Sequence, residues 1–157
     1  MRLWSPERVA DVLERESNLL GHVFGPGNFR IEEADPDVAI VHSQLVRCDF
    51  AYERDRDRQL TTMLTPIGVP EEVALPHPLD TWNGLVGLEI SASPRDSAGR
   101  VKATLQEQMV SELRVLGRVV HKLFSDPART RDAAYFAAGY NQAYNDWASR
   151  KGSWTEV

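Results

Sequence analysis

Cysteine is almost absent, and the histidines are scattered. Cys48 is the only cysteine among 157 residues, which excludes an internal disulfide and any zinc site built from several cysteines. Cys48 alternates with Val46 and Phe50, so we expect it to be buried and inert. The histidines lack the HExxH, HxH and Cys-His spacings of metal sites, so no metal is predicted. They are His22, His42, His77 and His121.

The chain also has no long apolar run. Nothing approaches the roughly 18 consecutive apolar residues of a membrane span. The N-terminal stretch MRLWSPERVADVLERE becomes charged too early for a secretory signal peptide. Basic residues are outnumbered as well, because 23 acids and 18 Lys or Arg residues leave a net charge of -5. These features predict a cytoplasmic protein that binds neither nucleic acid nor a membrane.

No catalytic or cofactor-binding motif is present. The serines lack the GxSxG context of a hydrolase nucleophile. The sequence GPGNF at residues 25–29 lacks the lysine and the following helix of a phosphate-binding loop. The acids clustered at residues 32–37 lack the closing glutamate of a calcium loop. The sequence therefore predicts no cofactor.

The patterns that are present predict one α+β domain over residues 1–157. An amphipathic helix is expected over residues 6–20, because Ser5 and Pro6 form a helix-start signal and apolar residues follow at helical spacing. Glu16 interrupts its apolar stripe, and the GPG sequence at residues 25–27 stops any continuation.

Alternating apolar residues predict strands in the middle of the chain. The expected strands cover residues 29–32, 38–43, 46–52, 60–66 and 86–90. The apolar positions change parity around residues 43–45, which requires a bulge or a break there. Prolines make residues 66–84 a predicted long loop, and residues 91–99 a linker.

Two helices are expected at the C-terminal end, from about residue 100 to 123 and from 127 to 149. The first has a polar face that carries Glu107, Glu112, Arg114 and Arg118. The second places four aromatic residues on one side, namely Phe136, Tyr140, Tyr144 and Trp147. The expected fold class is α+β, with an N-terminal helix, a mainly antiparallel sheet of about five strands, and two C-terminal helices packed on the sheet.

The stretch AYERDRDRQL at residues 51–60 sets the register of one hairpin. A three-residue loop at residues 55–57 puts apolar residues opposite one another, whereas a two-residue turn does not. The predicted pairs are Tyr52 with Leu60, Phe50 with Thr62, and Cys48 with Leu64. Such a loop commonly has its third residue in the left-handed region, which Asp57 tolerates.

The arginines of this hairpin are candidate binding residues. In the predicted register Arg54 lies directly opposite Arg58, which is unfavourable unless an anion separates them. In one interpretation, Asp55, Asp57 or an acid from a helix supplies that anion. In the other, Arg54, Arg56 and Arg58 bind a partner's carboxylate or phosphate through their planar guanidinium groups.

The segment LPHPLDTWNG at residues 75–84 is the most enzyme-like part of the chain. His77 and Asp80 suit general acid–base chemistry, and Trp82 suits a pocket wall or a binding surface. No activated nucleophile lies nearby in the sequence. The structural alternative places Trp82 in the core and Asp80 at the start of a short helical turn.

The aromatic side of the last helix is a further candidate surface. Tyrosine and tryptophan are enriched in protein–protein hot spots, so Tyr140, Tyr144 and Trp147 are candidate contacts. The same side can instead be the core-facing stripe of the helix, or the seam of a homodimer.

The sequence favours a non-enzymatic protein-binding module, of the kind found among immunity-type inhibitors and adaptors in bacteria. Its partner is expected to be another protein. The expected contact residues are Arg54, Arg56, Arg58, Trp82, Tyr140, Tyr144 and Trp147. Two alternatives remain open: a small-ligand domain with a pocket between sheet and helices, and a hydrolase-like enzyme that uses His77 and Asp80.

Overall fold

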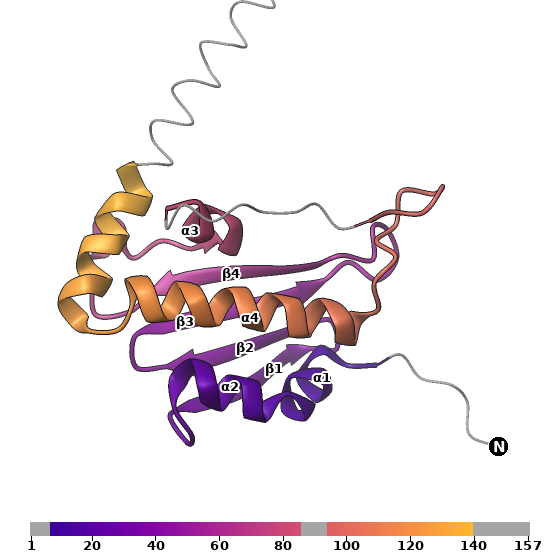
Figure 1. Ribbon diagram of the computed structural model, residues 1–157, viewed down its shortest axis with the longest axis horizontal. Coiled ribbons are helices and arrows are strands. Elements are labelled where there is room, and N and C mark those ends of the chain that lie inside the picture. The colour runs from indigo at the N-terminus through magenta and orange to yellow at the C-terminus, as the bar shows by residue number, and fades with distance from the viewer. Residues whose placement is uncertain (1–6, 86–93, 140–157) are drawn as a thin grey trace, which may run out of the picture.

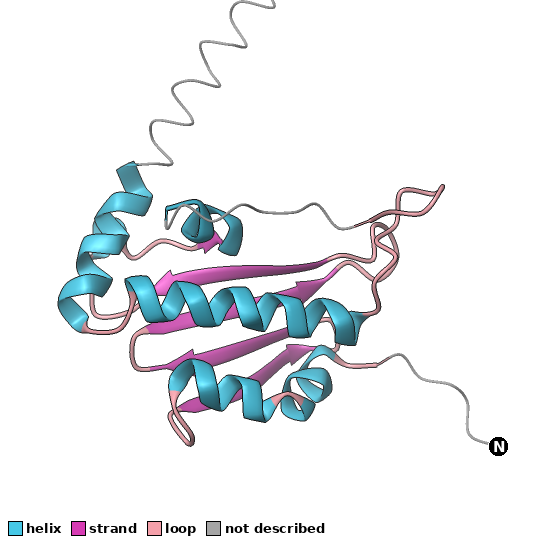
Figure 2. Cartoon of the chain, in the orientation of Figure 1, coloured by secondary structure: helices cyan, strands magenta, loops and turns pink. Residues whose placement is uncertain are grey.

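The computed structural model describes residues 7–85 and 94–139 and confirms the α+β class. The helices are α1 (Val9–Arg15), α2 (Ser17–Phe24), α3 (Leu79–Leu85) and α4 (Leu105–Leu123), with a 3-10 turn at Glu71–Val73 and a further helix over residues 127–139. The strands are β1 (Phe29–Asp35), β2 (Val38–Ser43), β3 (Val46–Tyr52), β4 (Leu60–Pro66) and β5 (His77–Pro78). Figures 1 and 2 show α1, α2 and α4 lying against one face of the sheet.

The sheet is antiparallel throughout and has the order β1-β2-β3-β4-β5. The predicted register of the β3–β4 hairpin is confirmed, with Tyr52 opposite Leu60 and Cys48 opposite Leu64. The predicted break at residues 43–45 is also confirmed, because β2 ends at Ser43 and β3 begins at Val46. Cys48 is fully buried as predicted, and burial raises the pKa of its thiol.

The predicted single helix over residues 6–20 is instead two helices, joined at Glu16. The backbone of Glu16 (φ -100°, ψ 27°) departs from helical values, and its N–H donates to Leu13 O, three residues back. This tightened turn ends α1 and redirects the chain into α2.

The ends of this helical segment also differ from the prediction. Arg8 is extended and the N–H of Val9 donates to Pro36 O, so the first helix begins at Val9. The second continues to Phe24, where Gly25 takes a φ of 90° that a residue with a Cβ rarely adopts. The start signal at Ser5 and Pro6 lies outside the described residues.

The prediction of a loop over residues 66–84 is wrong, because this segment contains the 3-10 turn, β5 and most of α3. Strand β5 pairs with β4 and places His77 opposite Leu64. Proline is tolerated at Pro78 because β5 is the last strand of the described sheet, where fewer backbone donors are needed. The predicted strand at residues 86–90 lies outside the described residues.

Helix α4 supplies the largest share of the helical core. It begins later than residue 100, at Leu105, because Thr104 and Glu107 form a capping box. Its buried residues pack on the sheet between α2 and α3. They are Leu105, Gln108, Met109, Leu113, Leu116, Val119 and Val120.

Part of the predicted linker is also structured. Residues 96–99 turn tightly, with the Asp96 carboxylate accepting the N–H groups of Ala98 and Arg100. The N–H of Val101 then donates to Asp57 O at 2.8 Å, which ties this segment to the tip of the β3–β4 hairpin.

Candidate functional site

The tip of the β3–β4 hairpin is longer than predicted. Arg58, rather than Asp57, takes the left-handed conformation, with a φ of 51°. Its N–H donates to Glu53 O at 2.8 Å, and this bond closes a four-residue turn at residues 54–57. Arg54 and Arg58 are therefore not directly opposed, which differs from the prediction.

Arg54 is held by an acid that lies far away in the sequence. Its Nη2 and Nε atoms lie 2.7 and 2.9 Å from Asp37 Oδ1, and Nη2 also donates to Glu7 O at 2.5 Å. Its guanidinium also lies over the Tyr52 ring, 5.3 Å from the centroid. The anion is thus Asp37 rather than Asp55 or Asp57, and Arg54 joins the hairpin to the β1–β2 turn.

The other two arginines of the hairpin remain exposed. Arg56 and Arg58 extend from a tip whose backbone is anchored, because Gln108 Nε2 donates to Arg58 O at 2.8 Å. Their role in binding a partner stays a prediction.

Trp82 is a core residue and not a surface contact, which corrects its prediction as a binding residue. Its side chain has no exposed area. Its Nε1 donates to Leu64 O and His77 O at 3.2 Å each, and its ring meets His77 and Phe124 edge to face at 5.2 and 5.1 Å. Trp82 therefore fastens α3 and β5 to β4 and to the end of α4.

The two residues of the enzyme alternative differ in accessibility. His77 is 3% exposed and lies against Trp82, whereas Asp80 is exposed in the first turn of α3. Burial lowers the pKa of His77. A substrate therefore does not reach the His77 ring without a rearrangement around α3.

Tyr140, Tyr144 and Trp147 lie outside the described residues. The described helix over residues 127–139 buries small residues, and Ala133 and Ala137 are among them. Phe136, predicted to share a side with the three aromatic residues, is 72% exposed.

Glu112 lies in an environment that the sequence pattern does not indicate. It was expected on the polar face of its helix, but it lies mostly buried against β4, where its Oε2 accepts a hydrogen bond from Thr62 Oγ1 at 2.9 Å. Burial raises the pKa of Glu112 to about 7. The nearby charge of Asp80 raises it further, and the Thr62 hydrogen bond acts in the opposite direction.

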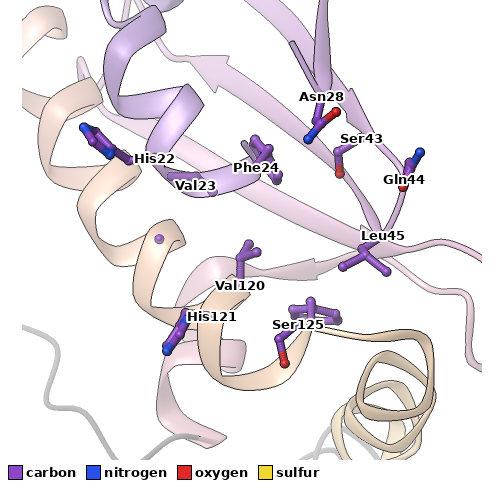
Figure 3. A pocket seen from close by; sticks show the side chains of 12 residues that line it. His22, Val23, Phe24, Asn28, Ser43, Gln44, Leu45, Val120, His121 and Ser125 are labelled. Carbon is purple, nitrogen blue, oxygen red and sulfur yellow. The ribbon is translucent and has the colours of Figure 1, made fainter. Parts of the chain in front are cut away.

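A pocket of about 280 Å³ lies between α2, α4 and the turn that joins β2 to β3. Figure 3 shows His22 and His121 on one side of it, and Asn28, Ser43 and Gln44 on the other. The lining residues are His22, Val23, Phe24 and Asn28 from α2 and the loop after it, Ser43, Gln44 and Leu45 from the turn, and Gly117, Val120, His121, Phe124 and Ser125 from α4 and the residues after it.

The pocket combines an apolar floor with a polar rim. Val120 and Phe124 are buried beneath it. The Ser43 hydroxyl holds the turn, because it donates to Val46 O and accepts from Val46 N. No hydrogen bond to the rest of the described chain occupies the polar side chains of the rim, which are those of His22, Asn28, Gln44 and His121.

Gly117 forms part of the pocket at the middle of α4. Glycine in a helix interior is about 1 kcal/mol less favourable than alanine. A Cβ at this position would meet only Val23 Cγ2, at an ordinary contact distance of 3.5 Å. Packing therefore does not require glycine here, and its effect is to leave the surface between α2 and α4 open.

Two further hollows adjoin the pocket. One, of about 410 Å³, continues along α4 and shares His22, Gly117 and His121. The other, of about 350 Å³, shares Asn28, Ser43 and Gln44 and reaches the ends of β1 and β2. None of the residues that line the three hollows is acidic, whereas Arg30, Arg114 and Arg118 are among them.

The pocket is the feature that sequence reasoning missed, although a pocket between sheet and helices was one of the alternatives. His22 and His121 are 99 positions apart in the chain and come together only in the fold. Gly117 is the one local signal, because glycine inside a strong helical pattern is about 1 kcal/mol less favourable than alanine. Within the described residues, no group of three or more His, Cys, Asp or Glu side chains could hold a metal ion.

Comparison of the chain with family models, with curated proteins and with solved structures finds no match. In the described part of the chain, no helix is both long enough and apolar enough to cross a bilayer.

Proposed function

We propose that the protein is a non-enzymatic binding domain that takes a small ligand in the pocket between α2, α4 and the β2–β3 turn. Pockets of this kind pair an apolar surface with a few polar groups that orient the ligand. The burial of Trp82 and the internal pairing of Arg54 remove two of the contacts expected of a protein-binding surface, which favours the pocket.

Gly117 is the observation that carries this proposal. The helix accepts an unfavourable residue at a position where alanine would fit, and that position borders both the pocket and the hollow beside it. A ligand that occupies this space explains why the surface stays open at a cost in helix stability.

Filling this space should abolish ligand binding without unfolding the protein. We expect Gly117→Trp to lose the small aromatic fragments that bind the wild type in an NMR fragment screen. The matched control Gly117→Ala should keep at least the fragments that enter from the β2–β3 turn. It should also raise the free energy of unfolding by up to about 1 kcal/mol, because alanine favours the helix. Fragments that bind Gly117→Trp as well as the wild type would place the site elsewhere.

A second candidate function is protein binding through the hairpin tip. It is favoured by the anchored backbone of the tip, since Asp57 O and Arg58 O both accept hydrogen bonds from other segments while Arg56 and Arg58 remain exposed. An anchored tip with exposed arginines loses little entropy when it binds a carboxylate-bearing surface.

This second candidate predicts that charge reversal at the tip releases a partner. A protein captured from native lysate by the tagged wild type should be retained at least about tenfold less by Arg56→Glu/Arg58→Glu, because each lost charge-assisted hydrogen bond is worth over 1 kcal/mol. The Gly117→Trp variant should still capture it. Equal capture of the partner by the wild type and the hairpin variant would exclude the tip as its binding site.

A further inference from the structure

Two arginines lie one turn apart beside the pocket. Arg114 and Arg118 both line the 410 Å³ hollow that continues from the pocket across Gly117, and His22 and His121 line both spaces. Like charges four residues apart on a helix repel one another weakly. The pair thus costs helix stability unless an anion lies over it.

No acid of the described chain supplies that anion. Within residues 7–85 and 94–139, neither Arg114 nor Arg118 forms an ion pair, whereas Arg8, Arg15, Arg47 and Arg54 each have an acidic partner. The residues that line the hollow are Leu19, Val23, Leu113 and Gly117 besides the four basic ones. This basic surface stands on a protein whose net charge is -5, so its charge is local and concentrated.

We propose that the ligand of the pocket is an organic anion, with its phosphate or carboxylate group over Arg114 and Arg118 and its apolar body against Val23 and Gly117. This inference rests on the proposed function and adds the chemical class of the ligand. A guanidinium group donates two parallel hydrogen bonds to such an oxyanion, and two groups one turn apart can share one. The apolar side chains between the helices accept the rest of the molecule.

The test compares two probes that share the same apolar body and differ in whether they carry a phosphate group. Backbone amide shifts of the full chain are followed by NMR during titration with 2-naphthyl phosphate and with neutral 2-naphthol. We expect both to shift residues around Gly117, with the phosphate binding about tenfold more tightly. Arg114→Gln/Arg118→Gln should remove that preference and leave the weaker binding of 2-naphthol unchanged.

The hairpin provides a control with the same change in net charge. Arg56→Gln/Arg58→Gln also removes two positive charges from exposed positions, and it should keep the preference for the phosphate. If both double variants lost the preference for the phosphate equally, net charge rather than Arg114 and Arg118 would decide binding. Circular dichroism of each variant verifies that the fold is retained.

The outcomes separate this inference from the proposed function. If the two probes bind the wild type equally well around Gly117, the pocket stands and the anionic class is wrong. If neither probe shifts these residues, both proposals fail. Inorganic phosphate alone should bind more weakly than 2-naphthyl phosphate, because it leaves the apolar surface uncovered. Equal binding of the two would contradict the assigned position of the apolar body.

Discussion

Replacing Glu112 with glutamine should stabilise the protein at pH 8 by about 3 kcal/mol and change its stability little at pH 4.5. The cause is the environment of the carboxyl group. It lies mostly buried against β4, and burial raises its pKa from an ordinary 4.5 to about 7.

The sign follows from the two protonation equilibria. In the unfolded chain the Glu112 carboxyl releases its proton near pH 4.5, whereas in the folded protein it holds it to about pH 7. Protonation therefore favours the folded state. This contribution is fully present below pH 4.5 and is lost as the pH rises to 7. Glutamine resembles the protonated acid, and its carbonyl oxygen can still accept the Thr62 hydrogen bond.

Urea unfolding at pH 8 and at pH 4.5 measures this effect. Glu107→Gln is the matched control, since it makes the same charge change on the same helix. Hydrogen bonds from Thr104 lower the pKa of Glu107, so this variant should not gain stability at pH 8. If the free energies of unfolding of wild type and Glu112→Gln differ by the same amount at the two pH values, Glu112 does not titrate between them.

The strand pattern was predictable because register depends on local alternation. Pairing apolar residues across residues 51–60 predicts the observed partners of Cys48 and Tyr52. The tip was not predictable, because Arg54 pairs with Asp37, which lies 17 positions earlier and approaches only when β1 to β3 form. The same tip also explains why Arg58, and not Asp57 as predicted, takes the left-handed conformation.

Helix starts were missed both where a local capping signal was overlooked and where tertiary contacts decide. The capping box at Thr104 is readable in the sequence, although the apolar pattern alone suggested an earlier start. The start at Val9 depends on a bond to Pro36 in another segment. The division at Glu16 comes from a tightened turn back to Leu13 O, which the apolar spacing does not reveal. The burial of Glu112 likewise results from the packing of α4 against β4, where Thr62 donates a hydrogen bond to it, and no helical pattern reveals that contact.

The candidate site was hardest to predict because three separate segments build it. Residues near 22, 44 and 120 share no sequence pattern, and each has an ordinary role in its own element. For Trp82 the sequence left two interpretations open, and the structure supports the core. Because Trp82 is a core residue, its removal is expected to have the largest effect on stability.

Replacing Trp82 with alanine should lower the free energy of unfolding by about 3–5 kcal/mol. The side chain has no exposed area, so its removal leaves a cavity between α3, β4 and the end of α4. Its loss also leaves Leu64 O and His77 O without the indole N–H. Domains of this size have about 5–15 kcal/mol of stability in total, so the variant should unfold at much lower urea concentration.

Two controls separate packing from a surface role. Leu75→Ala truncates a side chain in the same segment that is 45% exposed, and it should change stability by less than about 0.5 kcal/mol. Trp82→Phe keeps most of the apolar volume, so it should lower the free energy of unfolding less than Trp82→Ala does. If Trp82→Ala were as stable as Leu75→Ala, Trp82 would not be the residue that fastens α3 and β5 to the sheet. That result would instead support Trp82 as a surface contact, because an exposed tryptophan contributes to binding while adding little to stability.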